Sequence, residues 1–310
     1  MKTKTLTNQE KNTKSNDAAT LFKYNQKKTN QNDTRNTSGK STSSEQEPPS
    51  PGQLAYVRSI KRNKNMIRLL QLFILIAFLS LWEVAAHYNW INDFIFCSPS
   101  KLYSTFLDMM KDGSLPHHIG ITLYETLVGF AIVTFGSLLV AILFWWNTTL
   151  SKVFEPYLVM LNALPKSALA PVLIVWLGAN QTTIIVCACS VAIFGSILNI
   201  YTGFASLDND KLKLIETLKG NRFHCLRMVV LPSNVPNILS IMKVNIGLCL
   251  VGVVIGEFLA AKEGLGYLII YGSQTFKMSN VLLSILILCA IAMLLYMILQ
   301  RIERKLSEYF

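Results

Sequence analysis

Residues 124–146 read YETLVGFAIVTFGSLLVAILFWW, a stretch in which apolar side chains follow one another almost without interruption. A helix needs about 20 mostly apolar residues to cross the hydrocarbon core of a bilayer. Backbone polar groups find no water there, so such a stretch has to satisfy its own hydrogen bonds as a helix. Charged residues make up only 15% of the chain, well under the roughly 25% of a soluble domain. The sequence therefore predicts an all-α integral membrane protein.

Similar stretches recur along the 310 residues and predict about six transmembrane helices. Pro165 and Pro171 interrupt the third stretch, which is either one kinked span or a short broken one. Between the first two stretches, the pattern of residues 101–110 predicts a short amphipathic helix on the outer surface. The approximate bounds of the six spans are Ile67–His87, Tyr124–Trp146, Tyr157–Leu177, Thr182–Phe204, Asn237–Ala260 and Val281–Leu299.

The basic residues are concentrated in the N-terminal tail and on one side of the predicted spans. Residues 1–57 are mostly polar or basic, and we expect a disordered tail ahead of a transmembrane domain over residues 58–310. Lys and Arg also crowd residues 205–236 and the C-terminal end. Because basic loops stay in the cytoplasm, we expect both termini of this protein to be cytoplasmic, in a plasma or inner cell membrane.

The net charge of +11 is compatible with two kinds of partner. A basic chain can bind nucleic acid. Here the positive charges flank apolar stretches, where they orient membrane helices or attract anionic lipid headgroups. We therefore expect the lipid bilayer as a partner and no nucleic acid.

One long loop, about residues 205–236, has an amphipathic pattern: ASLDNDKLKLIETLKGNRFHCLRMVVLPSNVP. Its apolar residues recur at helical spacing, which predicts a pair of helices broken near Gly220. We expect Leu231, Pro232 and Pro236 to end this pair before the fifth span. An apolar stripe of this kind either packs on the protein's own helices or on the membrane, or docks into a groove of a partner protein.

This loop resembles the cytoplasmic signature of permease subunits of ATP-binding-cassette importers, which reads E-A-A, three residues, Gly, then an apolar stretch ending in Leu-Pro. Residues 229–232 (VVLP) match its end, with Arg222, Phe223 and Arg227 also in place. The chain is similar to the branch that imports nitrate, sulfonate, taurine, bicarbonate or thiamine-precursor compounds. Further matching stretches, within a resemblance that runs roughly from Leu69 to the C-terminus, are Ala163–Pro171, Trp176–Gly178, Gly252–Leu259 and Gly264–Gly272.

The loop also departs from that signature. When the sequences are aligned on Leu231-Pro232, the signature's Glu falls on Lys213, its alanines on Leu214 and Ile215, and its Gly on Lys219. Glu216 and Gly220 lie close enough to substitute in part.

The resemblance implies a type I importer permease fold and a division of labour between subunits. The permease would form a homodimer whose loop inserts into a groove on a cytoplasmic ABC ATPase, while an extracytoplasmic solute-binding protein delivers the solute. The residues that would make the ATPase contact are Leu212, Ile215, Glu216, Leu218, Gly220, Phe223, Leu226, Leu231 and Pro232.

The residues offer no constellation for catalysis. The sequence has no G-x-x-x-x-G-K-[ST] phosphate loop, G-x-S-x-G or H-E-x-x-H motif, so we expect no enzyme activity, cofactor or metal site. Lys166 and Glu257 are charged residues in predicted spans, where charges are costly. Each either forms a structural Glu–Lys pair or lines the translocation pathway. The alternative function is an ion-gradient-driven secondary transporter, which would show paired broken helices in two related halves.

Overall fold

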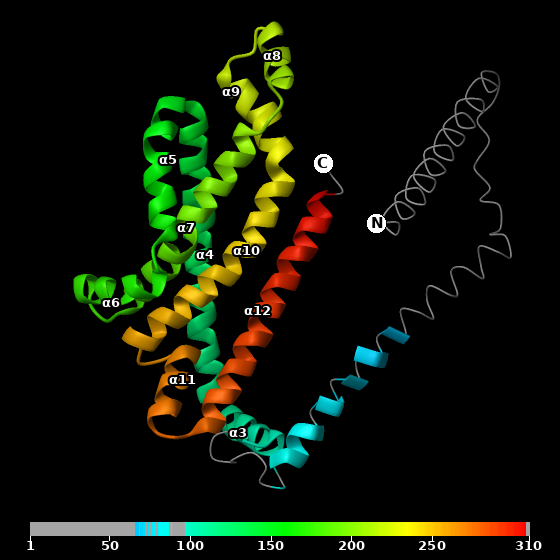
Figure 1. Ribbon diagram of the computed structural model, residues 1–310, viewed down its shortest axis with the longest axis vertical. Coiled ribbons are helices and arrows are strands. Elements are labelled where there is room, and N and C mark those ends of the chain that lie inside the picture. The colour runs from blue at the N-terminus through cyan, green and yellow to red at the C-terminus, as the bar shows by residue number, and fades with distance from the viewer. Residues whose placement is uncertain are drawn as a thin grey trace, which may run out of the picture. The chain divides into compact units, whose positions relative to one another are not determined.

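The computed structural model describes residues 66, 67, 69–71, 73, 74, 76–78, 80–86, 88 and 97–307. These residues are almost entirely helical, with no strand among them (Figure 1). The predicted polar tail of residues 1–57 lies outside the described residues.

Five of the described helical stretches are long and apolar enough to cross a membrane, and a bent pair makes a sixth if it counts as one span. This confirms the predicted membrane fold of about six spans. The pair consists of α5 (Thr148–Ala163) and α6 (Lys166–Leu177). The five single stretches are Leu69–Ala86, Ser114–Trp146 (α4), Gln181–Ala205 (α7), Arg222–Ala260 (α9 to α10) and Met278–Leu306, which lies in α12 (Met278–Ser307).

The third predicted span is broken, because α5 and α6 meet at an angle of 96°. Leu164 precedes Pro165 and is extended, with φ −61° and ψ 140°. A residue before proline avoids the helical conformation, since its backbone would clash with the proline ring. This ends α5 and starts α6 in a new direction. Pro171 lies inside α6 without breaking it.

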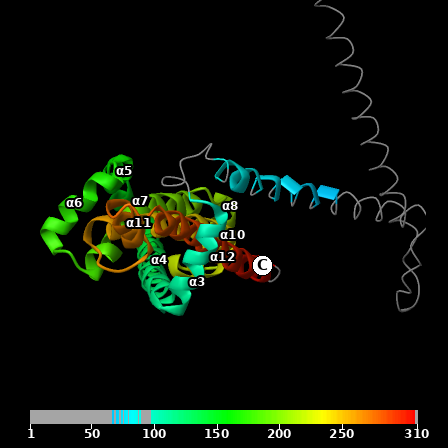
Figure 2. The ribbon, with the colours of Figure 1, turned by 90° about the horizontal axis from the view of Figure 1, so that it is seen from below.

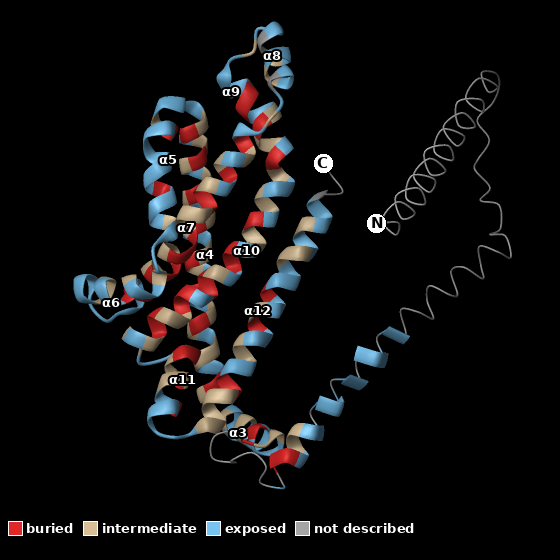
Figure 3. Ribbon diagram, viewed as in Figure 1, coloured by how far each residue is buried: buried red, intermediate tan, exposed pale blue. Residues whose placement is uncertain are grey.

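The core lies where α4, α7 and α10 (Leu231–Ala260) meet, and small residues allow the close approach. Ala188 of α7 is fully buried between Gly129 of α4 and Gly252 of α10. A β-carbon on Gly252 would lie 2.6 Å from the Cα atom of Ala188. Buried residues gather on these three helices, whereas α6 and α8 (Asn209–Thr217) are largely exposed (Figure 3). Seen from below, α5 and α6 lie to one side of the three (Figure 2).

The expectation that prolines end the loop helices before the fifth span is wrong. Residues 222–260 form one apolar helical stretch: α9 (Arg222–Cys225), a π-helical turn (Leu226–Val230) and α10. Pro232 and Pro236 thus lie inside a continuous helical stretch, where a proline's missing N–H leaves a carbonyl of the preceding turn without its helical hydrogen bond. The Asn234 side-chain amide donates a hydrogen bond to the Val230 carbonyl at 3.0 Å. This backbone acceptor near the prolines therefore has a partner.

The short amphipathic helix is confirmed as α3 (Pro99–Lys111), whose N-cap is Ser98. Its apolar residue Leu102 is buried, and Phe106 packs against a cluster around Leu115 and Leu265. The apolar stripe of α3 is thus covered by the protein's own core. Leu265 begins α11 (Leu265–Gln274), the helix that precedes α12.

Candidate functional site

The loop between α7 and α10 carries α8 and α9 at one end of the helical unit (Figure 1). Lys219 ends α8 in the left-handed conformation, with φ +60°, and the Gly220 N–H donates to the Ile215 carbonyl at 2.9 Å. This is the hydrogen-bond pattern of a Schellman helix end, whose left-handed residue is usually glycine. Lys219 is also the residue that the alignment places at the signature's Gly. Lys219 thus adopts a left-handed conformation that glycine takes more readily than other residues.

The predicted contact residues divide into two groups by exposure, and the first points outward. Leu218 is 72% exposed and Phe223 is 53% exposed. Two further apolar side chains, Leu214 and Met228, are exposed in the same segment and were not predicted as contacts. Leu218 directly follows α8, and its N–H donates to the Leu214 carbonyl at 3.2 Å, so the two lie one helical turn apart on the same side. We refer to Leu214, Leu218, Phe223 and Met228 as the exposed apolar set.

The second group packs on the protein's own helices. Leu226 is only 7% exposed and lies in a buried cluster with Phe204 of α7 and Ile241 of α10. Leu212 and Leu231 are partly buried against the same cluster. This part of the stripe packs on the protein's own helices, as one of the two interpretations expects, whereas the exposed apolar set has no such cover.

Two of the remaining predicted contact residues, Ile215 and Pro232, are intermediate in exposure between these two groups. Ile215 is half-buried and lies close to Gly220, where a β-carbon would come within 2.4 Å of the Ile215 side chain. Pro232 is half-buried in the first turn of α10. The backbone of Glu216 lies in α8, and its side chain is outside the description. The Arg222 guanidinium donates to the Trp146 carbonyl at 3.0 Å, which ties α9 to the end of α4.

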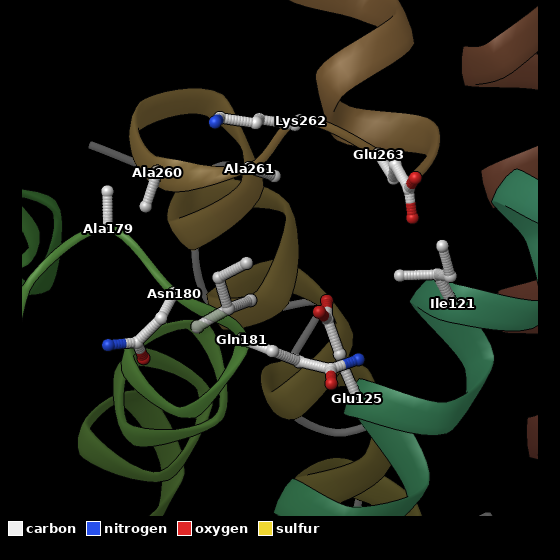
Figure 4. Close-up of a pocket in the computed structure, with 10 residues that line it drawn as sticks. Ile121, Glu125, Ala179, Asn180, Gln181, Ala260, Ala261, Lys262 and Glu263 are labelled. Carbon is white, nitrogen blue, oxygen red and sulfur yellow. The ribbon is translucent and has the colours of Figure 1, made fainter.

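A polar pocket of about 340 Å³ lies at the other end of α4, α7 and α10 (Figure 4). It is bounded by the first turns of α7, the first half of α4 and the loop that follows α10. Its polar lining residues are Glu125, Asn180, Gln181, Lys262 and Glu263, and its apolar ones are Ile121, Ala179, Ile184, Ala260 and Ala261.

Glu257 lies beside this pocket and anchors the start of α11. Its side chain is 1% exposed, and its carboxylate accepts hydrogen bonds from the Thr122 hydroxyl at 2.7 Å and from the Gly266 N–H. Thr122 in turn accepts from the Leu265 N–H at 2.9 Å. A carboxylate at a helix N-terminus is stabilised by the free N–H groups and by the helix dipole. The described residues show these contacts and no Glu257–Lys ion pair.

The contacts of Glu257 explain two glycines of the stretch Gly264–Gly272, namely Gly264 and Gly266. A β-carbon on Gly264 or Gly266 would come within 2.3 Å or 2.7 Å of the Glu257 carboxylate oxygens. Gly264 also has φ +112°, a conformation that side chains other than glycine rarely adopt. The two glycines therefore let the chain wrap closely around the carboxylate.

Glu125 is the residue of this region that sequence reasoning missed. It is 2% exposed and approaches both Glu257 and Gln181. Its Oε2 atom is buried and has no hydrogen-bond partner among the described residues. The signal was present in the stretch quoted at the outset, because Glu125 is its only charged residue.

The other intramembrane charges have local partners. The Lys243 ammonium forms a 2.7 Å ion pair with Glu303 of α12. The Lys166 ammonium donates to the Asn162 side chain at 3.2 Å, across the break between α5 and α6. Lys166 is half-buried and does not line the polar pocket.

Residues 132–308, from the middle of α4 to the end of the chain, match the family described as "Binding-protein-dependent transport system inner membrane component". The chain belongs to this family. It is therefore the permease subunit of a binding-protein-dependent transport system and a multi-pass membrane protein, in agreement with the predicted class.

Three curated relatives share about a quarter of their aligned residues with this chain. A putative aliphatic sulfonates transport permease of Bacillus subtilis is 24% identical over 231 residues, which cover 74% of this chain and 84% of that protein. A probable ABC transporter permease of Haemophilus influenzae is 29% identical, over 74% of this chain and 94% of that one. The taurine transport permease of Escherichia coli is 24% identical, over 74% and 86%.

A solved structure has the same fold. An inward-facing MetNI methionine ABC transporter aligns with a TM-score of 0.53 at 16% identity, covering 61% of this chain and 94% of that one. The type I importer permease fold implied by the sequence is thereby confirmed.

Proposed function

We propose that the protein couples to a cytoplasmic ABC ATPase through the α8–α9 loop and forms the translocation pathway for a small solute. The observation that carries the proposal is the exposed apolar set on this loop. Large apolar side chains on a polar, basic loop remain uncovered by the protein's own core, and a helix that presents such a face typically docks in a groove of a partner. Lys166 and Glu257 belong to the proposed pathway region, Glu257 by anchoring α11 beside the pocket.

Two further partners follow from family membership. An extracytoplasmic solute-binding protein would deliver the solute to the end that carries the polar pocket. A second copy of the permease would complete the pathway. The apolar face of α6 supports this homodimer, because Val175 is 88% exposed and Trp176 is 78% exposed in a helix that turns sharply away from α5.

The solute is a nitrate-, sulfonate- or taurine-like anion or a thiamine-precursor-like compound. This range rests on the relatives, which include permeases named for aliphatic sulfonates, taurine and formylaminopyrimidine.

Co-purification tests the coupling proposal directly. The full chain, tagged at its C-terminus and extracted in mild detergent, is expected to bring with it a protein that contains a phosphate-loop motif. Mass spectrometry of the bound fraction identifies it. Recovery of the permease with no such ATPase, under conditions in which the permease stays folded, would contradict the proposal.

The proposed orientation places both termini and the α8–α9 loop in the cytoplasm. It is supported by the basic residues of that loop and of the C-terminal end. In a background without native cysteines, Asp112→Cys in the exposed turn after α3 is expected to react with an impermeant maleimide in intact cells. Thr217→Cys, which is exposed on α8, should react only after permeabilisation. The reverse pattern would show that the protein is inserted the other way round.

A further inference from the structure

Another pocket lies between α3 and the turn that joins α11 to α12. Its volume is about 450 Å³, within the range of about 300–1,000 Å³ that is usual for small organic ligands. α3 lies beside the start of α12 (Figure 1), and the Cys97 thiol, just before α3, lies 3.0 Å from the Ser279 hydroxyl in the first turn of α12. Its polar lining residues with a side-chain ammonium, hydroxyl or amide are Lys101, Thr105, Lys277, Ser279 and Asn280.

The described lining of this pocket is positively charged, and we refer to it as the basic pocket. Lys101 lies in the first turn of α3 and Lys277 directly before α12, so two ammonium groups from separate segments border the same space. No Asp or Glu is among the lining residues that the structure describes, and no ion pair of Lys277 is found in the described part of the chain. Glu83 accepts a hydrogen bond from the Ser100 N–H at 3.3 Å and does not line the pocket.

The polar groups of the basic pocket suit an anion with several acceptor oxygens. Ammonium, hydroxyl and amide N–H groups all donate hydrogen bonds, and lysine is a common partner of phosphate oxygens. The start of α12 adds to the same field, because the first N–H groups of a helix have no partner within it and favour negative charge. A phosphate group can use all of these donors at once.

The rim of the basic pocket has the character of a membrane–water boundary. Phe276 has φ +57°, a left-handed conformation that is rare for a bulky residue and that tends to occur at ligand sites. Its side chain is 65% exposed. Aromatic and Lys side chains together are typical of the ends of membrane spans. From the pocket, α12 continues as a span, and its residues Ile285 and Leu286 are exposed.

We propose that the basic pocket binds the phosphate group of an anionic phospholipid, with the Lys101 and Lys277 ammonium groups donating charge-assisted hydrogen bonds to its oxygens. A soluble phosphate ester offers the same headgroup chemistry. The position of the pocket at the start of a span favours the lipid, whose acyl chains then lie along the exposed apolar side chains of α12. Placing this lipid in the outer leaflet rests on the proposed orientation, whereas the binding itself depends neither on that orientation nor on the ATPase.

The test uses the full-length protein, purified and freed of lipid in mild detergent, and three probes. Dioctanoyl phosphatidylglycerol carries both the phosphate and the acyl chains, dioctanoylglycerol lacks the phosphate, and glycerol 3-phosphate lacks the chains. Native mass spectrometry measures the bound probe. We expect phosphatidylglycerol to be retained at concentrations at which the other two are not. It should also protect Lys101 and Lys277, and not Lys111, from acetylation by an amine-reactive ester, as read by peptide mass spectrometry.

Substitution then assigns the binding to the two lysines. Lys101→Gln with Lys277→Gln removes both charges and should weaken phosphatidylglycerol binding by about tenfold to thirtyfold, since each basic side chain near an anionic lipid contributes about fivefold. Lys111→Gln is the matched control, because Lys111 is an exposed lysine at the other end of α3 that does not line the pocket. It should bind the lipid as the unmutated protein does.

Four outcomes would overturn the proposal. Equal retention of dioctanoylglycerol would show that the phosphate is not recognised, and displacement of the lipid by an equal concentration of glycerol 3-phosphate would show a site for soluble phosphate esters. Unchanged acetylation of Lys101 and Lys277 would place the lipid elsewhere. An equal loss of binding in Lys111→Gln would show a general effect of surface charge. If the double variant does not fold, the probes and the acetylation pattern of the unmutated protein still decide.

Discussion

Leu218→Glu is expected to abolish solute uptake while leaving the permease folded in the membrane. Leu218 is 72% exposed, so the substitution removes little contact within the protein. If the exposed apolar set fills a groove on an ATPase, the new carboxylate would be buried there without a partner. Central apolar contacts of an interface typically contribute about 2 kcal/mol or more each, which corresponds to a loss of affinity of roughly thirtyfold, and the unpaired charge adds to it.

Two comparison variants separate docking from general damage to the loop. Thr217→Glu adds the same charge to the neighbouring, exposed position of α8 and should keep ATPase recovery and uptake. Leu226→Glu places a charge in the buried cluster with Phe204 and Ile241, so it should lower permease abundance as well. Abundance, ATPase recovery and uptake are measured in the same membranes. Normal ATPase recovery and uptake with Leu218→Glu would refute the docking assignment for α8.

Gly252→Val is expected to disturb the packing of α7 against α10 and so to lower the amount of folded permease several-fold. The first side-chain atom alone would lie 2.6 Å from the Ala188 Cα atom and 3.1 Å from the Cys187 carbonyl oxygen. Both are backbone atoms, which cannot turn aside as the end of a side chain can. Overpacking a core typically costs about 1–3 kcal/mol and sometimes more, against a total stability of about 5–15 kcal/mol for a typical protein.

Gly247→Val is the matched control for this prediction, because Gly247 lies on the same helix and a β-carbon there meets no atom within 4 Å. Membrane abundance and the apparent Tm of the detergent-extracted protein are the measurements. We expect a large loss of both for Gly252→Val and little change for Gly247→Val. Equal behaviour of the two variants would show that close contact at Gly252 does not hold the helices together.

The sequence was sufficient for the membrane class, for most helix positions and for the family. A long apolar stretch has one stable form in a bilayer, since only a helix satisfies its backbone there. Local rules also predicted the short amphipathic helix that is α3 and allowed a break near Pro165. The loop of residues 205–236 was found because an amphipathic pattern on a polar segment is visible in one dimension.

Only the tertiary structure shows which side of each helix is buried and which side is exposed. Leu218 and Leu226 look alike in the sequence, yet one faces outward and the other lies under α7 and α10, because the π-helical turn and α9 rotate the segment in a way that spacing does not show. The pairing of Glu125 with Glu257 joins residues far apart in the chain. It arises only because small residues at Gly129, Ala188 and Gly252 bring α4, α7 and α10 close enough for two carboxyls to meet.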